Sequence, residues 1–277
     1  MPLETVIHPS AVIEKGAELG AGVRIGPFCH VGPQAVIGDQ VELVSHVTIL
    51  GETTLGQGCR VYPTAVLGGP PQDLKYKGGR TTLSVGRNCI VREGMTIHRG
   101  TETGRGHTAV GDDCYLMAYT HIAHDCIVGN KVTMANYAGL GGHAEIGDAV
   151  ILSGYAAVHQ FVRVGHHAFL GGYAAVVGDV IPYGMAVGDR AKLRGLNVIG
   201  MKRSGMPRSE LVQLRKAYRM LFDPDQPLAA NIGRVAAAFP GSAVVADMLH
   251  FVEGKEKRHF TVPPRGRAID DDDDGED

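Results

Sequence analysis

The chain has 277 residues and a formal net charge of −2; 44% of its residues are hydrophobic and 20% are charged. A chain of this length forms one large or two modest domains. The amino-terminal segment Met-Pro-Leu-Glu-Thr resembles no signal sequence, and no apolar run reaches membrane-spanning length. We therefore expect a cytoplasmic protein that does not insert into a membrane.

Aliphatic residues recur every six positions through most of the chain. The repeat covers residues 7–67, returns over 85–97 and runs again over 110–176, which gives 26 hexads. A second inward position, two residues before each aliphatic, holds mainly small residues. Small residue, outward residue and large aliphatic form a short strand, and the Gly, Asp, Asn and Pro residues between them favour turns. This pattern predicts a β-solenoid.

Three hexads per coil would give a triangular prism with a coil of 18 residues. The 26 hexads then form nearly nine coils, and the prism would be roughly 40 Å tall. The period alone sets neither the number of sides nor the hand of the winding, and general rules for parallel strands favour a right-handed one.

All five cysteines occupy the small inward position of a hexad. They are Cys29, Cys59, Cys89, Cys114 and Cys126. A disulfide framework or a zinc cluster would need a different spacing. We therefore expect buried, unpaired thiols in the core.

The repeat is interrupted twice, at about 68–84 and at about 101–109. Leu67 and Val85 lie 18 positions apart, which keeps the hexad phase, whereas Ile97 and Val110 lie 13 positions apart. Seven residues looping out after one hexad would explain the second interruption. We expect insert loops at both places, and loops on a rigid scaffold often carry function.

The repeat ends near Val180, and helical patterns follow. We expect a β-helix over 1–188, an α-helical domain over 189–264 and a disordered acidic tail over 265–277. One helix would start at the possible N-cap Ser209, and two more would lie near 228–239 and 242–252. The last eight residues include seven acids, so the rest of the chain has a net charge of +5.

Nine basic residues and one acid lie between positions 190 and 219. This cluster suits an acidic partner or a phosphorylated ligand. Nucleic acid is not expected as a partner, because aromatic residues do not alternate with the basic ones there.

Five histidines gather on one outward flank when the coil length is 18 residues and seven residues loop out after Ile97. They are His98, His121, His124, His143 and His159. Such a column supports general-base catalysis or a three-histidine zinc site, as in solenoid carbonic anhydrases. Asp125 directly after His124 favours acid–base chemistry, with no metal and no cofactor. A zinc-dependent lyase and a non-catalytic scaffold remain the alternatives.

Several motifs resemble one family of enzymes. They are His121-Ile-Ala-His-Asp-Cys126, Gln72-Asp-Leu-Lys-Tyr76, Thr96-Ile-His-Arg-Gly-Thr101, Ala157-Val-His-Gln-Phe161 and Gly195-Leu-Asn197. They resemble the UDP-N-acetylglucosamine O-acyltransferases of lipid A synthesis, which are hexapeptide-repeat acyltransferases. The resemblance implies a left-handed β-helix and a homotrimer. It also implies transfer of a 3-hydroxyacyl group from acyl carrier protein to the 3-hydroxyl of UDP-N-acetylglucosamine, the first step of lipid A biosynthesis.

The same resemblance assigns roles to residues. His124 would be the general base, Asp125 its partner, and the backbone N–H of Gly142 the oxyanion donor. The substrate-binding residues would be Asp73, Lys75, His98, His121, His143, His159, Gln160, Gly172, Asn197 and Arg203. The basic segment would dock the carrier protein.

Three details stay open at this point. Ile199 and Ser204 stand where the family often has an acid and an arginine, beside the residues expected to contact the nucleotide. Some relatives acylate a 3-amino sugar, so an amide product remains an alternative. Gly172 leaves room that would favour a longer acyl group.

Overall fold

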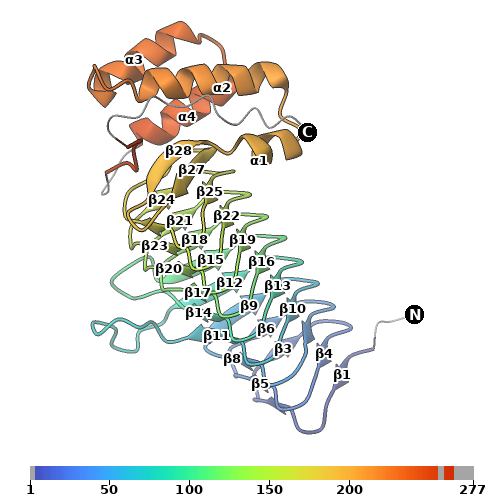
Figure 1. Cartoon of the computed structure of the whole chain (residues 1–277). Helices are drawn as coiled ribbons and strands as arrows, with labels where there is room; N and C mark the ends of the chain where they lie inside the picture. The colour runs from blue at the N-terminus through green and yellow to red at the C-terminus, as the bar shows by residue number, and fades with distance from the viewer. Residues whose placement is uncertain (1–3, 255–258, 265–277) are drawn as a thin grey trace.

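Three parallel β-sheets form the sides of a triangular prism in the computed structural model, which describes residues 4–254 and 259–264 (Figure 1). The expected acidic tail lies outside these residues. Sheet A contains β1 (Val6–Ile7), β4 (Arg24–Ile25), β7 (Glu42–Leu43), β10 (Arg60–Val61), β13 (Ile90–Val91), β16 (Tyr115–Leu116), β19 (Thr133–Met134), β22 (Ile151–Leu152), β25 (Phe169–Leu170), β27 (Gly184–Val187) and β28 (Lys192–Leu196).

The two other sides are built in the same way. Sheet B contains β2 (Val12–Ile13), β5 (His30–Val31), β8 (Thr48–Ile49), β11 (Val66–Gly69), β14 (Thr96–His98), β17 (His121–Ile122), β20 (Gly139–Leu140), β23 (Ala157–Val158) and β26 (Ala175–Val176). Sheet C contains β3 (Glu18–Leu19), β6 (Val36–Ile37), β9 (Glu52–Leu55), β12 (Thr82–Val85), β15 (His107–Val110), β18 (Ile127–Val128), β21 (Glu145–Ile146) and β24 (Arg163–Val164).

From β1 to β26, neighbouring strands of a sheet are parallel and three positions apart in the chain. At the end of sheet A, β25 pairs in parallel with β27, and β27 pairs with β28 in the antiparallel direction. Ile122 of β17 stands opposite Leu140 of β20, which in turn stands opposite Val158 of β23. This register confirms the predicted three hexads per coil. It also stacks equivalent residues of successive coils, as in other parallel sheets.

The inward residues of the hexads fill the prism. Leu116, Ile122 and Leu140 are fully or almost fully buried, as are the small residues two positions before them. The five cysteines are also buried and form no disulfide. The predicted core thiols are therefore confirmed.

Both interruptions of the repeat leave the prism as loops, but they are shorter than expected. The first spans residues 70–81 and the second spans 99–106. The flanking residues form strands instead, because they pair with the neighbouring coils. β12 thus pairs over four residues with both β9 and β15. Ile97 stands opposite Ile122, as the expected insertion of seven residues requires.

The helical segments pack at the carboxy-terminal end of the prism, opposite the first coil (Figure 1). They are α1 (Val198–Arg203), α2 (Arg208–Leu221), α3 (Leu228–Ala238) and α4 (Ala243–Glu253). β27 and β28 continue sheet A across the boundary predicted at residue 188. No helix within residues 4–254 and 259–264 is long and apolar enough to cross a membrane.

Ser209 does not cap α2, so this part of the prediction was wrong. The helix begins at Arg208, and the capping position is Pro207 with φ −57°. The fixed φ of proline already suits entry into a helix. Ser209 therefore lies inside the first turn.

We expect the inward and outward residues of one strand to differ sharply in their effect on stability. In β6, Ile37 is 1% exposed and Val36 is 38% exposed. Ile37→Ala should lower the free energy of unfolding by about 2–5 kcal/mol, because it leaves a cavity. Val36→Ala should change it by less than about 1 kcal/mol. Urea unfolding of both variants measures the difference, and equal losses would contradict the assigned register.

Candidate active site

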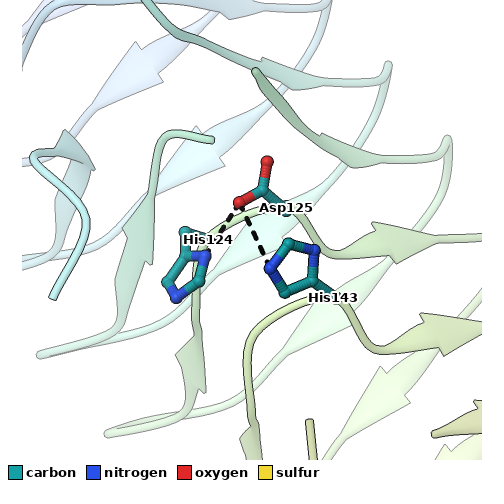
Figure 2. Close-up of side chains that lie close together, drawn as sticks. All are labelled: His124, Asp125 and His143. Atoms are coloured by element: carbon teal, nitrogen blue, oxygen red, sulfur yellow. Dashed lines mark hydrogen bonds and ion pairs between the residues drawn. The ribbon is translucent and has the colours of Figure 1, made fainter. Parts of the chain in front are cut away.

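His124 and Asp125 form a hydrogen-bonded pair at the corner after β17. Nδ1 of His124 donates to Oδ2 of Asp125 at 2.8 Å (Figure 2). A carboxylate oxygen can only accept this bond, so the proton lies on Nδ1. The Asp125 side chain is fully buried, whereas 15% of the His124 side chain is exposed. Nε2 of His124 is therefore left to act as a base.

The second insert loop surrounds the Asp125 carboxylate. Burial by itself would raise the pKa of Asp125, but hydrogen bonds from Thr101 and His124 outweigh this effect and lower that pKa. The carboxyl group is consequently ionised at neutral pH and can stabilise a protonated His124.

His143 lies one coil away and completes the cluster. Its Nε2 is 3.8 Å from Oδ2 of Asp125 (Figure 2). The ring meets that of His124 edge to face at 5.2 Å and stacks on the ring of Phe161 at 4.4 Å. These two ring contacts restrict the orientation of the His143 imidazole.

Gly142 lies directly against the His124 ring. A Cβ atom at this position would be 2.7 Å from Cε1 and 2.8 Å from Nε2 of His124, so any side chain would displace the base. Within the described residues, the N–H of Gly142 donates no backbone hydrogen bond. Gly142 thus lies against the His124 ring, and its N–H has no backbone acceptor in the part of the chain that the structure describes.

His98 and His121 extend the column along sheet B. Their rings meet edge to face at 5.1 Å, and the Thr96 hydroxyl lies 2.7 Å from Nδ1 of His121. Burial lowers the pKa of His121. Burial and then the charges of His121 and His124 lower the pKa of His98 to about 4. Both histidines are therefore neutral at neutral pH.

One pocket brings together many of the predicted residues. Its lining includes His124, His143, Gln160 and two residues of the first insert loop, Asp73 and Lys75. Residues that the sequence analysis did not select also line it: Thr103, Gly104, Arg105, Glu145 and Arg163. The first three belong to the second insert loop, so the interruption of the repeat was the signal for them.

Asn197 and Arg203 lie elsewhere, in a cavity of about 340 Å³ on sheet A below α2. Asn197 has a structural role there: its Oδ1 accepts from the Gly200 N–H at 3.0 Å and its Nδ2 donates to the His167 carbonyl at 2.9 Å. Ile199 and three further arginines also line the cavity: Arg194, Arg215 and Arg219. Only the basic cluster of the sequence pointed to these arginines.

His159 and Gly172 are not part of the pocket around His124. His159 is exposed, and its Nδ1 lies 3.2 Å from the Gln160 carbonyl. Gly172 lies at a different corner of the prism, where the nearest atom to an added Cβ would be the Gly154 carbonyl oxygen at 3.6 Å. A side chain at this position would therefore meet that carbonyl oxygen at ordinary van der Waals distance.

Among the described residues, one group has the composition of a metal site: His124, Asp125 and His143, whose ligand atoms lie within 4.8 Å of one another. Nδ1 of His124 is already bonded to Asp125, and other donors also occupy the carboxylate. The arrangement therefore suits a histidine–carboxylate pair better than a zinc ion held by three histidines.

Family models and a solved structure identify the class of enzyme to which this chain is similar. A family model described as bacterial transferase hexapeptide matches residues 16–51 and 107–142, and a model described as the second domain of UDP-N-acetylglucosamine O-acyltransferase matches 179–261. A UDP-N-acetylglucosamine acyltransferase from Campylobacter jejuni has a similar structure, with a TM-score of 0.88 and 39% identity over 93% of this chain and 100% of its own.

Curated relatives define the particular family. The acyl-[acyl-carrier-protein]–UDP-N-acetylglucosamine O-acyltransferase of Mesorhizobium japonicum is 57% identical over 100% of this chain and 99% of its own length. The enzyme of the same name from Brucella ovis is 55% identical over 96% and 95%. The chain belongs to this family of acyltransferases, and its β-helix is left-handed.

The depressed pKa of His98 predicts a loss of stability in acid. Below the unfolded pKa of about 6.5, the unfolded chain takes up a proton at this position and the folded chain does not. Stability should therefore fall as the pH drops from about 6.5 towards the folded value of about 4. In urea unfolding across this range, His98→Gln should show a shallower fall than the wild type.

An exposed histidine provides the control for this prediction. His8→Gln should retain the pH dependence of the wild type, because His8 is exposed. If His98→Gln also retained it, the buried histidine would not be the cause.

Gly142→Ala should impair acyl transfer because the new methyl group would push His124 out of position. We expect a loss of about tenfold or more in kcat with little change in thermal stability. Gly233→Ala is the control, because an added Cβ there meets nothing within 4 Å. A Gly142→Ala enzyme with wild-type kcat would contradict the close approach of the ring.

Proposed function

We propose that this chain transfers a 3-hydroxyacyl group from acyl carrier protein to the 3-hydroxyl of UDP-N-acetylglucosamine, with His124 as the general base. The names of the relatives give both substrates. The observation that supports His124 is its geometry: Nδ1 is bonded to Asp125, and Nε2 lies so close to Gly142 that an added Cβ there would be 2.8 Å from it.

The reaction then follows from these groups. Nε2 of His124 takes the proton of the sugar hydroxyl as its oxygen attacks the thioester carbonyl carbon. The Gly142 N–H donates to the oxyanion of the tetrahedral intermediate. Collapse of the intermediate breaks the C–S bond, and the leaving thiolate takes the proton from His124 to form the thiol of the carrier protein. Asp125 stabilises the imidazolium between the two proton transfers.

The surrounding polar residues would bind the substrates. Asp73, His143 and Gln160 lie around the same pocket as His124 and suit the hydroxyls of the sugar. Lys75, on the exposed loop, would meet the acyl donor. His98 and His121 are neutral and support hydrogen bonds to uncharged groups. His159 would contact the sugar nucleotide from the adjacent position.

A homotrimer with sites between neighbouring prisms would unite the two separate regions. Asn197 and Arg203 line a cavity that shares no residue with the pocket around His124. We propose that the nucleotide reaches these residues on a second copy, and that the acyl chain passes Gly172, where an added Cβ would meet only the Gly154 carbonyl oxygen within 4 Å. Room at this glycine supports a longer acyl group.

The basic segment between positions 190 and 219 would bind the acidic carrier protein by electrostatic attraction. Four of its arginines line the cavity below α2, which places this charge at the carboxy-terminal end of the prism. We further propose a cytoplasmic location, because unpaired cysteines are typical of a reducing compartment.

A direct assay tests the proposal. Protein, 3-hydroxyacyl carrier protein and UDP-N-acetylglucosamine should yield the 3-O-acyl sugar nucleotide, detected by mass spectrometry. His124→Ala should lower kcat by about two to four orders of magnitude. His8→Ala should retain wild-type turnover, because His8 is exposed in the first coil.

The same assay separates the alternatives. A panel of acyl chain lengths, each offered with the 3-hydroxy and the 3-amino sugar nucleotide, would identify both preferences. An active trimer that forms no acylated product would refute the proposal, and wild-type turnover in His124→Ala would reject the assigned base.

A further inference from the structure

The second insert loop presents a set of donors to the buried carboxylate of Asp125. The Thr101 N–H lies 3.1 Å from both carboxylate oxygens, and the N–H groups of Arg105 and Gly106 donate to Oδ1 at 2.7 and 3.1 Å. The Thr101 hydroxyl donates to Oδ2 at 2.7 Å. Three backbone donors and one hydroxyl thus surround a single carboxylate.

The two carboxylate oxygens have different partners. Oδ1 accepts from backbone groups of the loop, whereas Oδ2 also accepts from the Thr101 hydroxyl and from Nδ1 of His124. Thr101 therefore provides the side-chain donor on the oxygen that His124 uses. A hydrogen bond to an ionised group is stronger than a neutral one.

Several contacts hold the second insert loop against Asp125. Thr101 is 1% exposed, and its carbonyl accepts from the N–H groups of Gly104 and Gly106. A Cβ at Gly104 would lie 2.6 Å from the Asp125 carboxylate, so glycine permits the close approach. The Arg105 guanidinium donates to the Asp125 carbonyl at 3.0 Å and pairs with Glu145 of sheet C.

We propose that Thr101 is a positioning residue for the base, an inference that rests on the proposed role of His124. Its hydroxyl holds the carboxylate so that Oδ2 faces His124. This contact keeps neutral His124 in the tautomer with the proton on Nδ1, and Nε2 then remains free to accept the substrate proton. In other histidine–carboxylate pairs, loss of the carboxylate allows the wrong tautomer and catalysis falls steeply.

Three variants test the role of the hydroxyl by kinetics. Thr101→Val keeps the shape of the side chain and removes the donor, so kcat should fall by about tenfold or more while KM for both substrates stays near wild type. Thr101→Ser keeps the donor and should restore most of the activity. Thr53→Val is the matched control, because the buried Thr53 hydroxyl donates to the Leu50 carbonyl at 2.7 Å in another coil.

Nitrogen NMR of labelled histidine provides a second measurement that does not depend on turnover. Neutral His124 should be protonated at Nδ1 in the wild type and in Thr101→Ser. In Thr101→Val, the fraction protonated at Nε2 should increase. Thr53→Val should leave the His124 signals unchanged.

Several results would overturn the inference. One is a Thr101→Val enzyme with wild-type kcat and tautomer, and another is a loss of activity matched by Thr53→Val or by Thr101→Ser. If the wild type transferred no acyl group, the proposed function would fail and the NMR measurement alone would decide the role of Thr101.

Discussion

The alternation of inward and outward residues within each hexad is the constraint on which the rest of the structure depends. Two inward side chains per hexad fill the prism, and the register between coils repeats every third strand. Because the core already consists of small and aliphatic residues, polar residues are directed to the corners and outer faces. His124 and His143 therefore lie outside the core and are partly exposed, whereas Ile122 is buried within it.

The regular turns at the corners of the prism require an unfavourable backbone conformation. Asp125, His143 and Phe161 occupy equivalent corners of three successive coils, with φ of 60°, 63° and 62°. This conformation costs a residue other than glycine about 1–2 kcal/mol. Hydrogen bonds from one coil to the next hold it in place, since the N–H groups of His143 and Phe161 donate to carbonyls of the coil before. The same strained backbone lines up the Asp125 carboxylate, the His143 imidazole and the Phe161 ring that stacks on it.

The two insert loops provide hydrogen-bond donors and pocket residues that the regular repeat does not. A regular coil offers Asp125 only its neighbours above and below, whereas the loop at 99–106 covers the carboxylate from the side and supplies donors. Burial of an ion without such donors would be unfavourable. The loop at 70–81 brings Asp73 and Lys75 to the same pocket. A rigid scaffold thus positions the base, and two departures from the repeat adapt its surroundings.

The sequence by itself determined the solenoid and the inward position of the cysteines, because both follow from a fixed period of six residues. The three-sided coil does not follow from that period alone; it is the assumption that gathers the histidines, and the register of the strands confirms it. The sequence also located the two inserts. Only the tertiary structure decided which side chains contact Asp125, where α2 begins, and that Asn197 and Arg203 lie away from His124. These features depend on irregular loops and on packing between distant segments, for which no period exists. The hydrogen bond from Thr101 to Asp125 likewise depends on the path of the loop at 99–106, which no period predicts.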